Sequence, residues 1–411
     1  MKTPWRMTAA LAGVILAVTA CGTGGQATTS PAGEQTADAT ETAATEASPV
    51  ESEGPRLESA CGNETFEGET VPIQFQLQWF PQAQFAGYFA ANELGCYSDV
   101  GLEVEILAGA VDIAPQVVVA AEDGPEFGEA WVPKVLQARA QGADLVNIAQ
   151  IFQRSGTLHV SFKEKNITSP EDWAGMRIGD WGFGNELEVF AAARQAGLEP
   201  GVDYERVAQD FDMTELINDE IDSAEAMIYN EYAQLLETAN EETGDLYQPD
   251  DLNIIDFNDV GVAMLQDHII ARESWLAGET NGVPNEEIAV RFLTASFKGW
   301  MICREDPEQC VEITTASGSQ LPAGHQAWMM NEINALIWPS PNGIGILDEA
   351  AFQQTLDICM QFCADPAVTE AVAEGAFRTD LAQQAVDTLA EFDTTGEDFE
   401  KAEIEVTPGG E

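Results

Sequence analysis

Basic residues are scarce in this sequence. Lysine and arginine together number 17, against 71 aspartate and glutamate residues, so the formal net charge is −54 at pH 7. Proteins that bind DNA or RNA neutralise the phosphates with clustered lysine and arginine side chains. The sequence contains no such cluster, and a field of this sign repels a polyanion. The composition therefore excludes nucleic acid as a partner.

The acidic residues are distributed along the whole chain rather than gathered in one tail. A net charge of magnitude about 2–8 is enough to keep a small domain soluble. We therefore hypothesise adaptation to a salty exterior, where ions screen the repulsion between carboxylates. The midpoint of heat unfolding is expected to rise between low and high NaCl. A midpoint that stays constant or falls with salt would contradict the hypothesis and favour a generic acidic exported protein.

Long apolar runs are absent except near the N-terminus. There, Lys2 and Arg6 precede the run AALAGVILAV, which is too short to span a bilayer but has signal-peptide length. The segment VTAC, which ends at Cys21, resembles the cleavage site of a bacterial lipoprotein signal. This resemblance implies a signal peptide over residues 1–20 and acylation of Cys21, which would anchor the protein to the membrane. An ordinary secretory signal is the alternative, and the lack of a second such run argues against a permease.

Aromatic and branched apolar residues are almost missing from the segment after Cys21. It reads GTGGQATTSPAGEQTADATETAATEASPVESEGP. Such a composition cannot bury enough apolar surface to offset the entropy that is lost on ordering. We therefore predict a disordered tether over residues 21–70, which joins the anchor to a folded body long enough for two domains.

Cysteine is also infrequent, with seven residues in the chain. Apart from Cys21, the cysteines are Cys61, Cys96, Cys303, Cys310, Cys359 and Cys363. An even number of cysteines in an exported protein indicates disulfide bonds. We predict the pair Cys303–Cys310, which closes a short loop around a proline, and the pair Cys61–Cys96, which fixes the end of the tether to the first helix. Cys359 and Cys363 lie four residues apart on one predicted helix face, a geometry that suits a disulfide poorly.

Histidine occurs only three times, at His159, His268 and His325. These positions are too scattered along the sequence to predict a metal site. We therefore expect neither a metal nor a cofactor.

From residue 71 onward, short apolar strands alternate with helical patterns, which is typical of an α/β protein with mostly parallel sheets. The alternation runs twice, and from MLQDHIIARESWL onward the segments are helical in pattern. We predict two lobes with a ligand held between them. Residues 71–157 form the first part of lobe 1 and residues 158–265 form lobe 2. Residues 266–411 form a strand that returns to lobe 1, followed by a helical C-terminal tail.

The segment LQWFPQAQFAGY mixes aromatic and amide side chains at the first strand-to-helix turn. In open α/β sheets, ligands bind beyond the carboxyl ends of the strands, where such turns lie. We predict that Trp79, Phe85 and Tyr88 form a stacking wall and that Gln82 and Gln84 bind heteroatoms of a ring. The alternative places the aromatic side chains in the core and the glutamines in solvent.

Three later turns carry further candidate ligand-binding residues. EFGEAW contributes Trp131 as an opposing aromatic face, with a core tryptophan as the alternative. GDWGFGNE contributes Trp181 and Asn185 as contacts to a neutral ring. IYNEYA contributes Tyr229 and Glu231, whose carboxylate would accept a hydrogen bond from an N–H group of a heterocycle. The alternative for Glu231 is a solvated acid that favours the helix dipole.

The stretch from Leu77 to Ile106 resembles the opening segment of the NMT1/THI5-like (SsuA/THI5-like) family of binding proteins. The matching positions are Trp79, Pro81, Ala86, Gly87, Gly95, Tyr97, Gly101 and Leu102. GPEFGEAW and SPEDWAGMRIG resemble two later segments of the family. The resemblance implies a type II periplasmic-binding-protein fold whose two lobes close on a small molecule. It also implies a monomer that delivers its ligand to the permease and ATPase subunits of an ABC importer.

Members of the family carry thiamine pyrimidine precursors, other vitamin-like heterocycles, nitrate, taurine or alkanesulfonates, and the fungal relatives are enzymes that make the thiamine pyrimidine. We expect an aromatic heterocycle here, either a thiamine pyrimidine precursor or riboflavin. Glu186 and Glu188 in the first turn of a helix, and the scarcity of cations, disfavour the nitrate or sulfonate alternative. Phe85 stands where pyrimidine-binding members often have a histidine, and CMQFC lies in the helical tail, which disfavours a synthase-type enzyme.

Overall fold

The computed structural model describes residues 61–63, 66–241, 243–363 and 366–411. All of them belong to the second of two units, Gly54–Glu411. The predicted signal peptide, Cys21 and the tether up to residue 60 lie outside the described residues. Within the described ranges, no helix combines the length and the apolar character that a membrane span requires.

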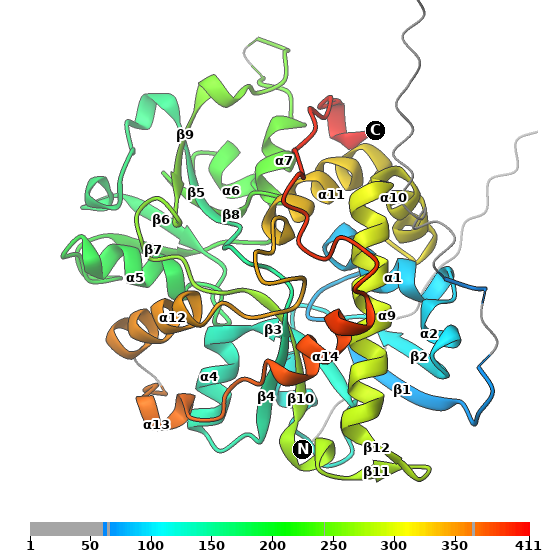
Figure 1. The fold of residues 1–411 in the computed structure, drawn as a ribbon. Coiled ribbons are helices and arrows are strands. Elements are labelled where there is room, and N and C mark those ends of the chain that lie inside the picture. The colour runs from blue at the N-terminus through cyan, green and yellow to red at the C-terminus, as the bar shows by residue number, and fades with distance from the viewer. Residues whose placement is uncertain (1–60, 64–65, 242, 364–365) are drawn as a thin grey trace, which may run out of the picture. The chain divides into compact units, whose positions relative to one another are not determined.

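The first sheet has five strands in the order β2-β1-β3-β10-β4 (Figure 1). β1 pairs in parallel with β2 and β3, whereas β10 runs antiparallel to β3 and β4. Alternation along β1 buries Val71, Ile73 and Phe75 on one face, as the sequence pattern predicts. The bounds are β1 Val71–Gln76, β2 Leu102–Leu107, β3 Phe127–Trp131, β4 Leu145–Gln150 and β10 Asp267–Arg272.

The second sheet has three strands in the order β8-β5-β9, and both pairs are antiparallel. A parallel pair, β6-β7, is joined to it by a bridge between Ile178 and Ser223. The bounds are β5 Thr157–Phe162, β6 Arg177–Asp180, β7 Glu205–Ala208, β8 Ala224–Met227 and β9 Leu252–Asp256.

The prediction of mostly parallel strands is confirmed, with two exceptions. β1, β2, β3 and β4 point the same way and so do β6, β7, β8 and β9, whereas β10 and β5 are reversed. Parallel neighbours need a crossover connection, usually a helix, between consecutive strands. β5 and β10 instead reach their sheets directly from the other sheet, and both run antiparallel to their neighbours. The alternation of strands and helices was correct, but it did not show which strands cross between the sheets.

Helices cover the sheets and make up the C-terminal part of the chain, as predicted. A short hairpin, β11 (Glu279–Thr280) with β12 (Val283–Pro284), precedes the longest helix, α9. The helices in the first half are α1 Ala86–Glu93, α2 Cys96–Asp99, α3 Pro115–Val118, α4 Val132–Ala140, α5 Leu187–Gln195, α6 Thr214–Ile217 and α7 Glu231–Leu236. Those in the second half are α8 Glu273–Leu276, α9 Asn285–Glu305, α10 Pro307–Ala316, α11 Ala323–Ile337, α12 Glu349–Phe362, α13 Glu370–Ala373 and α14 Asp380–Thr388.

Helix α1, directly after the first strand-to-helix turn, packs closely against α9. A Cβ atom on Gly299 would lie 1.9 Å from the carbonyl oxygen of Gly87, and a Cβ on Gly87 would overlap the ring of Trp300. The two glycines therefore allow the helix backbones to approach. This crossing fixes α1, and with it the turn that precedes α1, against the core.

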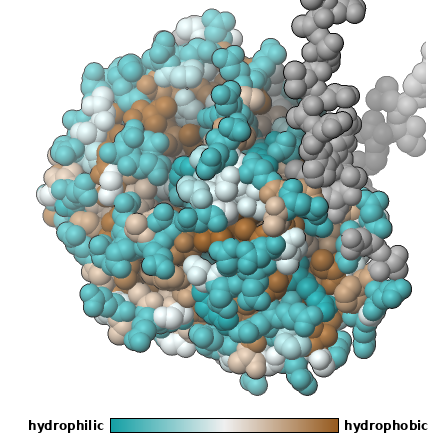
Figure 2. Space-filling model, in the orientation of Figure 1, coloured by the Kyte–Doolittle hydropathy of each residue, from teal (hydrophilic) through white to brown (hydrophobic). Residues whose placement is uncertain are grey.

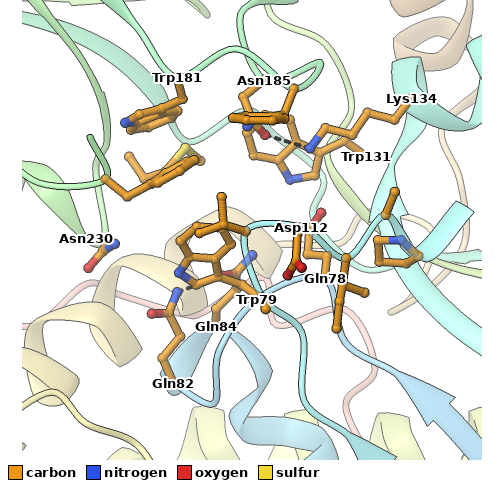
Figure 3. Close-up of a pocket in the computed structure, with 18 of the residues that line it drawn as sticks. Gln78, Trp79, Gln82, Gln84, Asp112, Trp131, Lys134, Trp181, Asn185 and Asn230 are labelled. Atoms are coloured by element: carbon orange, nitrogen blue, oxygen red, sulfur yellow. Dashed lines mark hydrogen bonds between the residues drawn. The ribbon is translucent and has the colours of Figure 1, made fainter. Parts of the chain in front are cut away.

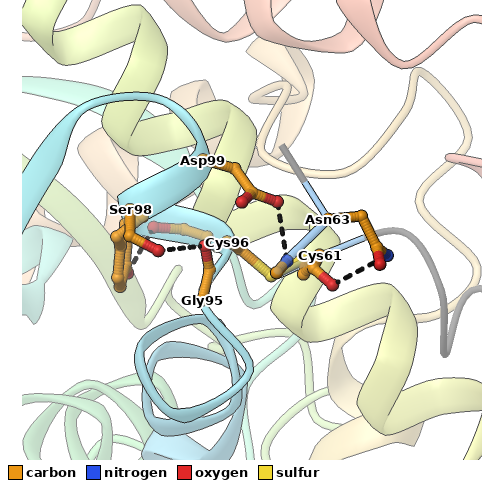
Figure 4. Close-up of a disulfide and its surroundings, with 9 residues drawn as sticks. Cys61, Asn63, Gly95, Cys96, Ser98 and Asp99 are labelled. Carbon is orange, nitrogen blue, oxygen red and sulfur yellow. Dashed lines mark hydrogen bonds between the residues drawn. A yellow bond between two sulfur atoms is a disulfide. The ribbon is translucent and has the colours of Figure 1, made fainter. Parts of the chain in front are cut away.

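Three disulfide bonds are present among the described cysteines. Cys61 is bonded to Cys96 (Figure 4), Cys303 to Cys310, and Cys359 to Cys363. The Gly62 amide also donates to the Asp99 carboxylate at 2.7 Å, beside the first of these bonds. The Cys359–Cys363 bond is present although the spacing was expected to suit a disulfide poorly. Helix α12 ends at Phe362, and Cys363 has an extended backbone conformation that lets its side chain turn back.

The face shown in Figure 2 is mostly hydrophilic, with hydrophobic residues exposed in narrower bands between polar ones. This agrees with the large excess of acidic residues in the sequence. The core beneath combines aromatic residues from several elements. Phe75 of β1, Phe127 of β3 and Phe292 of α9 are fully buried, and the rings of Phe127 and Phe292 are stacked at a centroid distance of 4.4 Å.

Candidate functional site

A cavity of about 370 Å³ lies at the carboxyl ends of strands from both sheets (Figure 3). On one side it is lined by the segments that follow β1, β2 and β3, and on the other by the segments that follow β6, β7 and β8. Ligand sites of open α/β folds occupy this position. The lining residues are Gln78, Trp79, Gln82, Gln84, Ala110, Val111, Asp112, Ile113, Ala114, Pro115, Gln116, Trp131, Lys134, Trp181, Phe183, Asn185, Phe211, Met227, Tyr229, Asn230 and Glu231.

Eight of the ten candidate ligand-binding residues line this cavity. They come from four turns that are far apart in the sequence. They are Trp79, Gln82, Gln84, Trp131, Trp181, Asn185, Tyr229 and Glu231. Strand-to-helix turns that carry aromatic and amide residues therefore converge on one space.

Phe85 and Tyr88 do not line the cavity. Both are fully buried in the core, and the Tyr88 ring packs edge-on against Phe75 at a centroid distance of 4.6 Å. Gln84 and Phe85 share the short 3-10 helix directly before α1, yet Gln84 lines the cavity while the Phe85 side chain is in the core. Tyr88 lies within α1, the helix that packs on α9. The predicted stacking wall at this turn is thus reduced to Trp79.

Asp267 holds three of the lining side chains in place, although it does not line the cavity itself. Its Oδ1 accepts hydrogen bonds from Gln78 Nε2 (2.5 Å) and Trp131 Nε1 (2.7 Å), and its Oδ2 accepts one from Gln84 Nε2 (2.6 Å). Gln82 Nε2 then donates to Gln84 Oε1 at 2.8 Å. Burial raises the pKa of Asp267 to about 7, even though these hydrogen bonds oppose the shift.

Sequence reasoning missed Asp267 because it begins β10, far from the other turns. The usable signal was the acidic residue at the start of the apolar strand in QDHII. An acid buried in such a strand almost always has hydrogen-bonding partners, so its position indicates a polar cluster. A second buried carboxyl, Glu129, lies behind it and accepts a hydrogen bond from the Tyr88 hydroxyl at 3.3 Å. Burial, with a contribution from Asp267, raises the pKa of Glu129 well above its usual value.

Aromatic rings from both sides of the cavity contact one another. Phe211, which follows β7, packs against Trp79 at a centroid distance of 4.6 Å and stacks on Trp181 at 5.8 Å. Figure 3 shows Trp79 and Trp181 on opposite sides of the cavity. Phe211 was not predicted, although a lone aromatic residue between two acids in DFD was a usable signal.

Lys134 is the cation among the described lining residues. Its Nζ lies 4.6 Å from the ring centroid of Trp131 and donates to Asn185 Oδ1 at 2.6 Å. Burial lowers its pKa to about 8, while the nearby Asp267, Glu186 and Glu225 carboxylates oppose this shift. Lys134 therefore connects Trp131, at the end of β3, to Asn185, in the turn after β6, across the cavity.

Glu231 and Asn230 close the cavity beside α7. The Glu231 carboxylate accepts hydrogen bonds from the Met227 amide (2.9 Å) and from Asn230 Nδ2 (2.7 Å). Burial raises the pKa of Glu231 to about 7. The Asn230 oxygen in turn lies 3.0 Å from Nε2 of His325, whose other ring nitrogen lies 2.9 Å from the Glu237 carboxylate. Glu231 is thus a buried, hydrogen-bonded group rather than a solvated acid.

No group of three or more histidine, cysteine or acidic side chains that could hold a metal ion occurs in the part of the chain that the structure describes. His159 and His268 are buried, and burial lowers their pKa to about 3 and about 4. Neither residue lines the cavity. The described lining residues also include no cysteine. What they offer a ligand is aromatic faces for stacking and side chains for hydrogen bonding.

Comparison with known proteins agrees with this geometry. The chain is 23% identical to the formylaminopyrimidine-binding protein of Halalkalibacterium halodurans over 252 residues, which covers 60% of this chain and 69% of that protein. The fold of the present chain resembles that of the periplasmic nitrate-binding protein of Synechocystis PCC 6803. The TM-score is 0.56 and the identity 15%, over 80% of this chain and 92% of the other.

The alkanesulfonate-binding protein of Xanthomonas axonopodis pv. citri has the same fold, with a TM-score of 0.54 and 12% identity over 76% of this chain and 99% of the other. The described residues thus have the α/β fold of periplasmic binding proteins. The family model described as NMT1/THI5 like matches residues 82–310, which is more than half of the chain. The chain therefore belongs to the NMT1/THI5-like family.

Proposed function

We propose that this protein is the extracytoplasmic solute-binding component of an ABC importer and that it binds a flat aromatic heterocycle. A thiamine pyrimidine precursor is the leading ligand and riboflavin the rival. The observation that carries the proposal is the convergence of Trp79, Trp131 and Trp181 with amide side chains around one cavity. Ring faces favour stacking, and the amides can donate to and accept from ring heteroatoms.

The similarity to a formylaminopyrimidine-binding protein supports a pyrimidine-like ligand. The charges around the cavity disfavour an anion such as nitrate or a sulfonate, although two structural neighbours bind these classes. Lys134 already donates to Asn185, and the carboxylates of Asp112 and Glu231 also line the space. An anion would therefore meet one shared cation and two acids.

Ligand capture would proceed by closure of two lobes, 71–157 with 266–411 and 158–265, around the connections between the sheets. Two buried side chains tie these connections together. Glu188 accepts hydrogen bonds from Ser155 Oγ (3.1 Å) and the Met264 amide (2.6 Å), and the Gln266 side-chain oxygen accepts one from the Gly156 amide (2.8 Å). A hinge of this kind would be biased toward closure by ligand contacts that exist only in the closed state.

Extracytoplasmic location and membrane anchoring through acylated Cys21 complete the proposal. Delivery to a permease requires the binding protein to work just outside the membrane, and a tether over residues 21–70 would allow this.

A thermal-shift panel tests the proposed ligand class. The protein from Gly54 onward, which keeps Cys61 and its bond to Cys96, would be heated in high salt with hydroxymethylpyrimidine, riboflavin, nitrate or taurine. Ligand at 100 times Kd is expected to stabilise the folded state by about 2.7 kcal/mol, so the pyrimidine or riboflavin should raise the unfolding midpoint. A shift with nitrate or taurine alone would refute the heterocycle.

Neighbouring aromatic residues provide a matched pair of variants for the same panel. Trp79→Leu removes a ring that lines the cavity, and stacking of a ring on an aromatic side chain contributes about 1–3 kcal/mol. Phe80→Leu changes the next residue, which is exposed and does not line the cavity. Only Trp79→Leu is expected to diminish the ligand-induced shift.

A further inference from the structure

Phe183 has an unusual backbone conformation at the mouth of the cavity. Gly182, Phe183 and Gly184 have φ values of 70°, 57° and 84°, all in the left-handed region. Glycine adopts this region freely, whereas a bulky side chain is strained there. The other non-glycine residues with positive φ in the described ranges are Asn166, Asp219 and Asn281. Asparagine and aspartate tolerate this conformation, so Phe183 is the exception that calls for an explanation.

The Phe183 side chain is also 73% exposed, although it lines the cavity. Large apolar side chains with substantial exposure are few in the described part of the chain: Phe80, Val111, Val117, Phe183, Val202 and Ile254. Val111 lines the same cavity from the segment after β2, and Val117 lines an adjoining cavity of about 500 Å³ together with Phe183. Exposed apolar residues therefore gather at the mouth from both sides, which marks a surface that becomes covered.

The turn that carries Phe183 is held at its base. Asn185 Nδ2 and the Asn185 amide both donate to the Gly182 oxygen, at 2.9 and 3.0 Å. The aliphatic chain of Lys134 packs beneath Gly184, 3.5 Å from the position that a Cβ would take.

Two further hydrogen bonds hold the glycine amides of this turn. The Gly182 amide donates to Asp180 at 3.0 Å, and the Gly184 amide donates to Glu186 at 2.8 Å. The two glycines lack a Cβ, so the tip can reorient about them when these two hydrogen bonds are exchanged, while its base stays attached to the cavity wall.

We propose that Phe183 is a ligand-contacting residue that covers the mouth of the cavity. When ligand is bound, Phe183 leaves the strained conformation and buries its ring against the bound heterocycle and against Val111 on the facing side. The empty protein then carries both the strain and the exposed ring, and both are relieved when the site is occupied. This inference rests on the proposed binding function and adds a residue that selects for a flat, apolar ligand edge at the mouth.

Phe183→Asn separates this role from a structural one. Asparagine tolerates the left-handed conformation but has no ring, so ligand-free protein should unfold at a temperature higher by about 1–3 °C. Stopped-flow tryptophan fluorescence with hydroxymethylpyrimidine or riboflavin, whichever binds the wild type, should show dissociation faster by about tenfold or more, with little change in association. Phe183→Leu keeps an apolar side chain and should lie between the two.

Val202→Asn is the matched control, because Val202 is 77% exposed and lies away from the cavity. It should behave as the wild type. Dissociation unchanged in Phe183→Asn, or a lower unfolding temperature of its ligand-free form, overturns this inference alone. Slower transport with unchanged dissociation also overturns it, because Phe183 would then serve contact with the permease. A wild type that binds neither heterocycle refutes the proposed function, and this inference with it.

Discussion

Replacing Asp267 with leucine is expected to abolish ligand binding and to lower the free energy of unfolding by several kcal/mol. Leucine has nearly the shape of aspartate but accepts no hydrogen bond. The substitution leaves the donors of Gln78, Gln84 and Trp131 without their shared acceptor. Each buried donor that loses its partner costs about 1–3 kcal/mol.

Asp267→Asn should reduce binding and stability less than Asp267→Leu, because asparagine keeps one side-chain oxygen that accepts hydrogen bonds. One asparagine oxygen remains to accept from Trp131, whose indole can only donate. The side-chain amide of Gln84 can rotate to present its oxygen to the new amide group. The Gln82–Gln84 hydrogen bond must then rearrange as well. We therefore expect a loss of binding that is smaller than for leucine but still about tenfold or more.

Urea unfolding and ligand titration of both variants measure these effects. Asp259→Leu is the control, because Asp259 is exposed and lies away from the cavity. Wild-type affinity in Asp267→Leu would show that Asp267 does not position the lining residues.

The second expected result is a fall in stability as the pH rises from about 6.5 to 8. Burial raises the pKa of three carboxyl groups, Glu188, Glu231 and Asp267, to about 7. It also raises the pKa of Glu129 and Glu225 well above the usual value. All five lie around the cavity or the connections between the sheets.

The direction follows from proton binding. A carboxyl whose pKa is raised in the folded state holds a proton that the unfolded state has already released, so the free energy of unfolding falls from the unfolded pKa up to the folded pKa and levels off above it. The three carboxyl groups with a pKa of about 7 therefore contribute to the fall up to about pH 7, and Glu129 and Glu225 continue it beyond. Each extra proton lowers the free energy of unfolding by about 1.4 kcal/mol per pH unit. Buried neutral His159 and His268 act in the opposite sense, since their pKa is lowered, but only below about 6.5.

Urea unfolding at several pH values between 6.5 and 8, in high NaCl to screen the surface charges, measures this dependence. Glu188→Gln removes one of the titrating groups and should flatten the decline. Glu171→Gln, at an exposed position, should leave it unchanged. Stability that is constant or increases over this range would contradict the assignment of raised pKa values.

Much of the candidate site could be predicted because it depends on local patterns. An aromatic or amide residue that follows an apolar strand and precedes a helix is placed at the carboxyl edge of a sheet by its neighbours in sequence. Trp79, Trp131, Trp181 and Tyr229 all satisfy this condition and line the cavity. The alternating pattern from residue 71 and the helical C-terminal part were likewise evident.

Residues whose role depends on distant partners could not be predicted in the same way. Tyr88 fits the pattern of the first turn, but the packing of α1 on α9 through Gly87 and Gly299 directs it into the core. Phe211 lies on a loop without periodicity. The reversed direction of β5 and β10 also escaped prediction, because it depends on which strands cross between the sheets.

By itself, the sequence determined the excess of acid, the alternation of strands and helices, and the turns that carry aromatic and amide side chains. These features depend on composition or on neighbours within a few residues. Only the tertiary structure decided that Asp267 joins Gln78, Gln84 and Trp131, and that Phe183 is exposed and strained at the mouth. Hydrogen bonds and burial are set by distance in space, and β10 brings Asp267 to the turn after β1 only once both strands lie in one sheet.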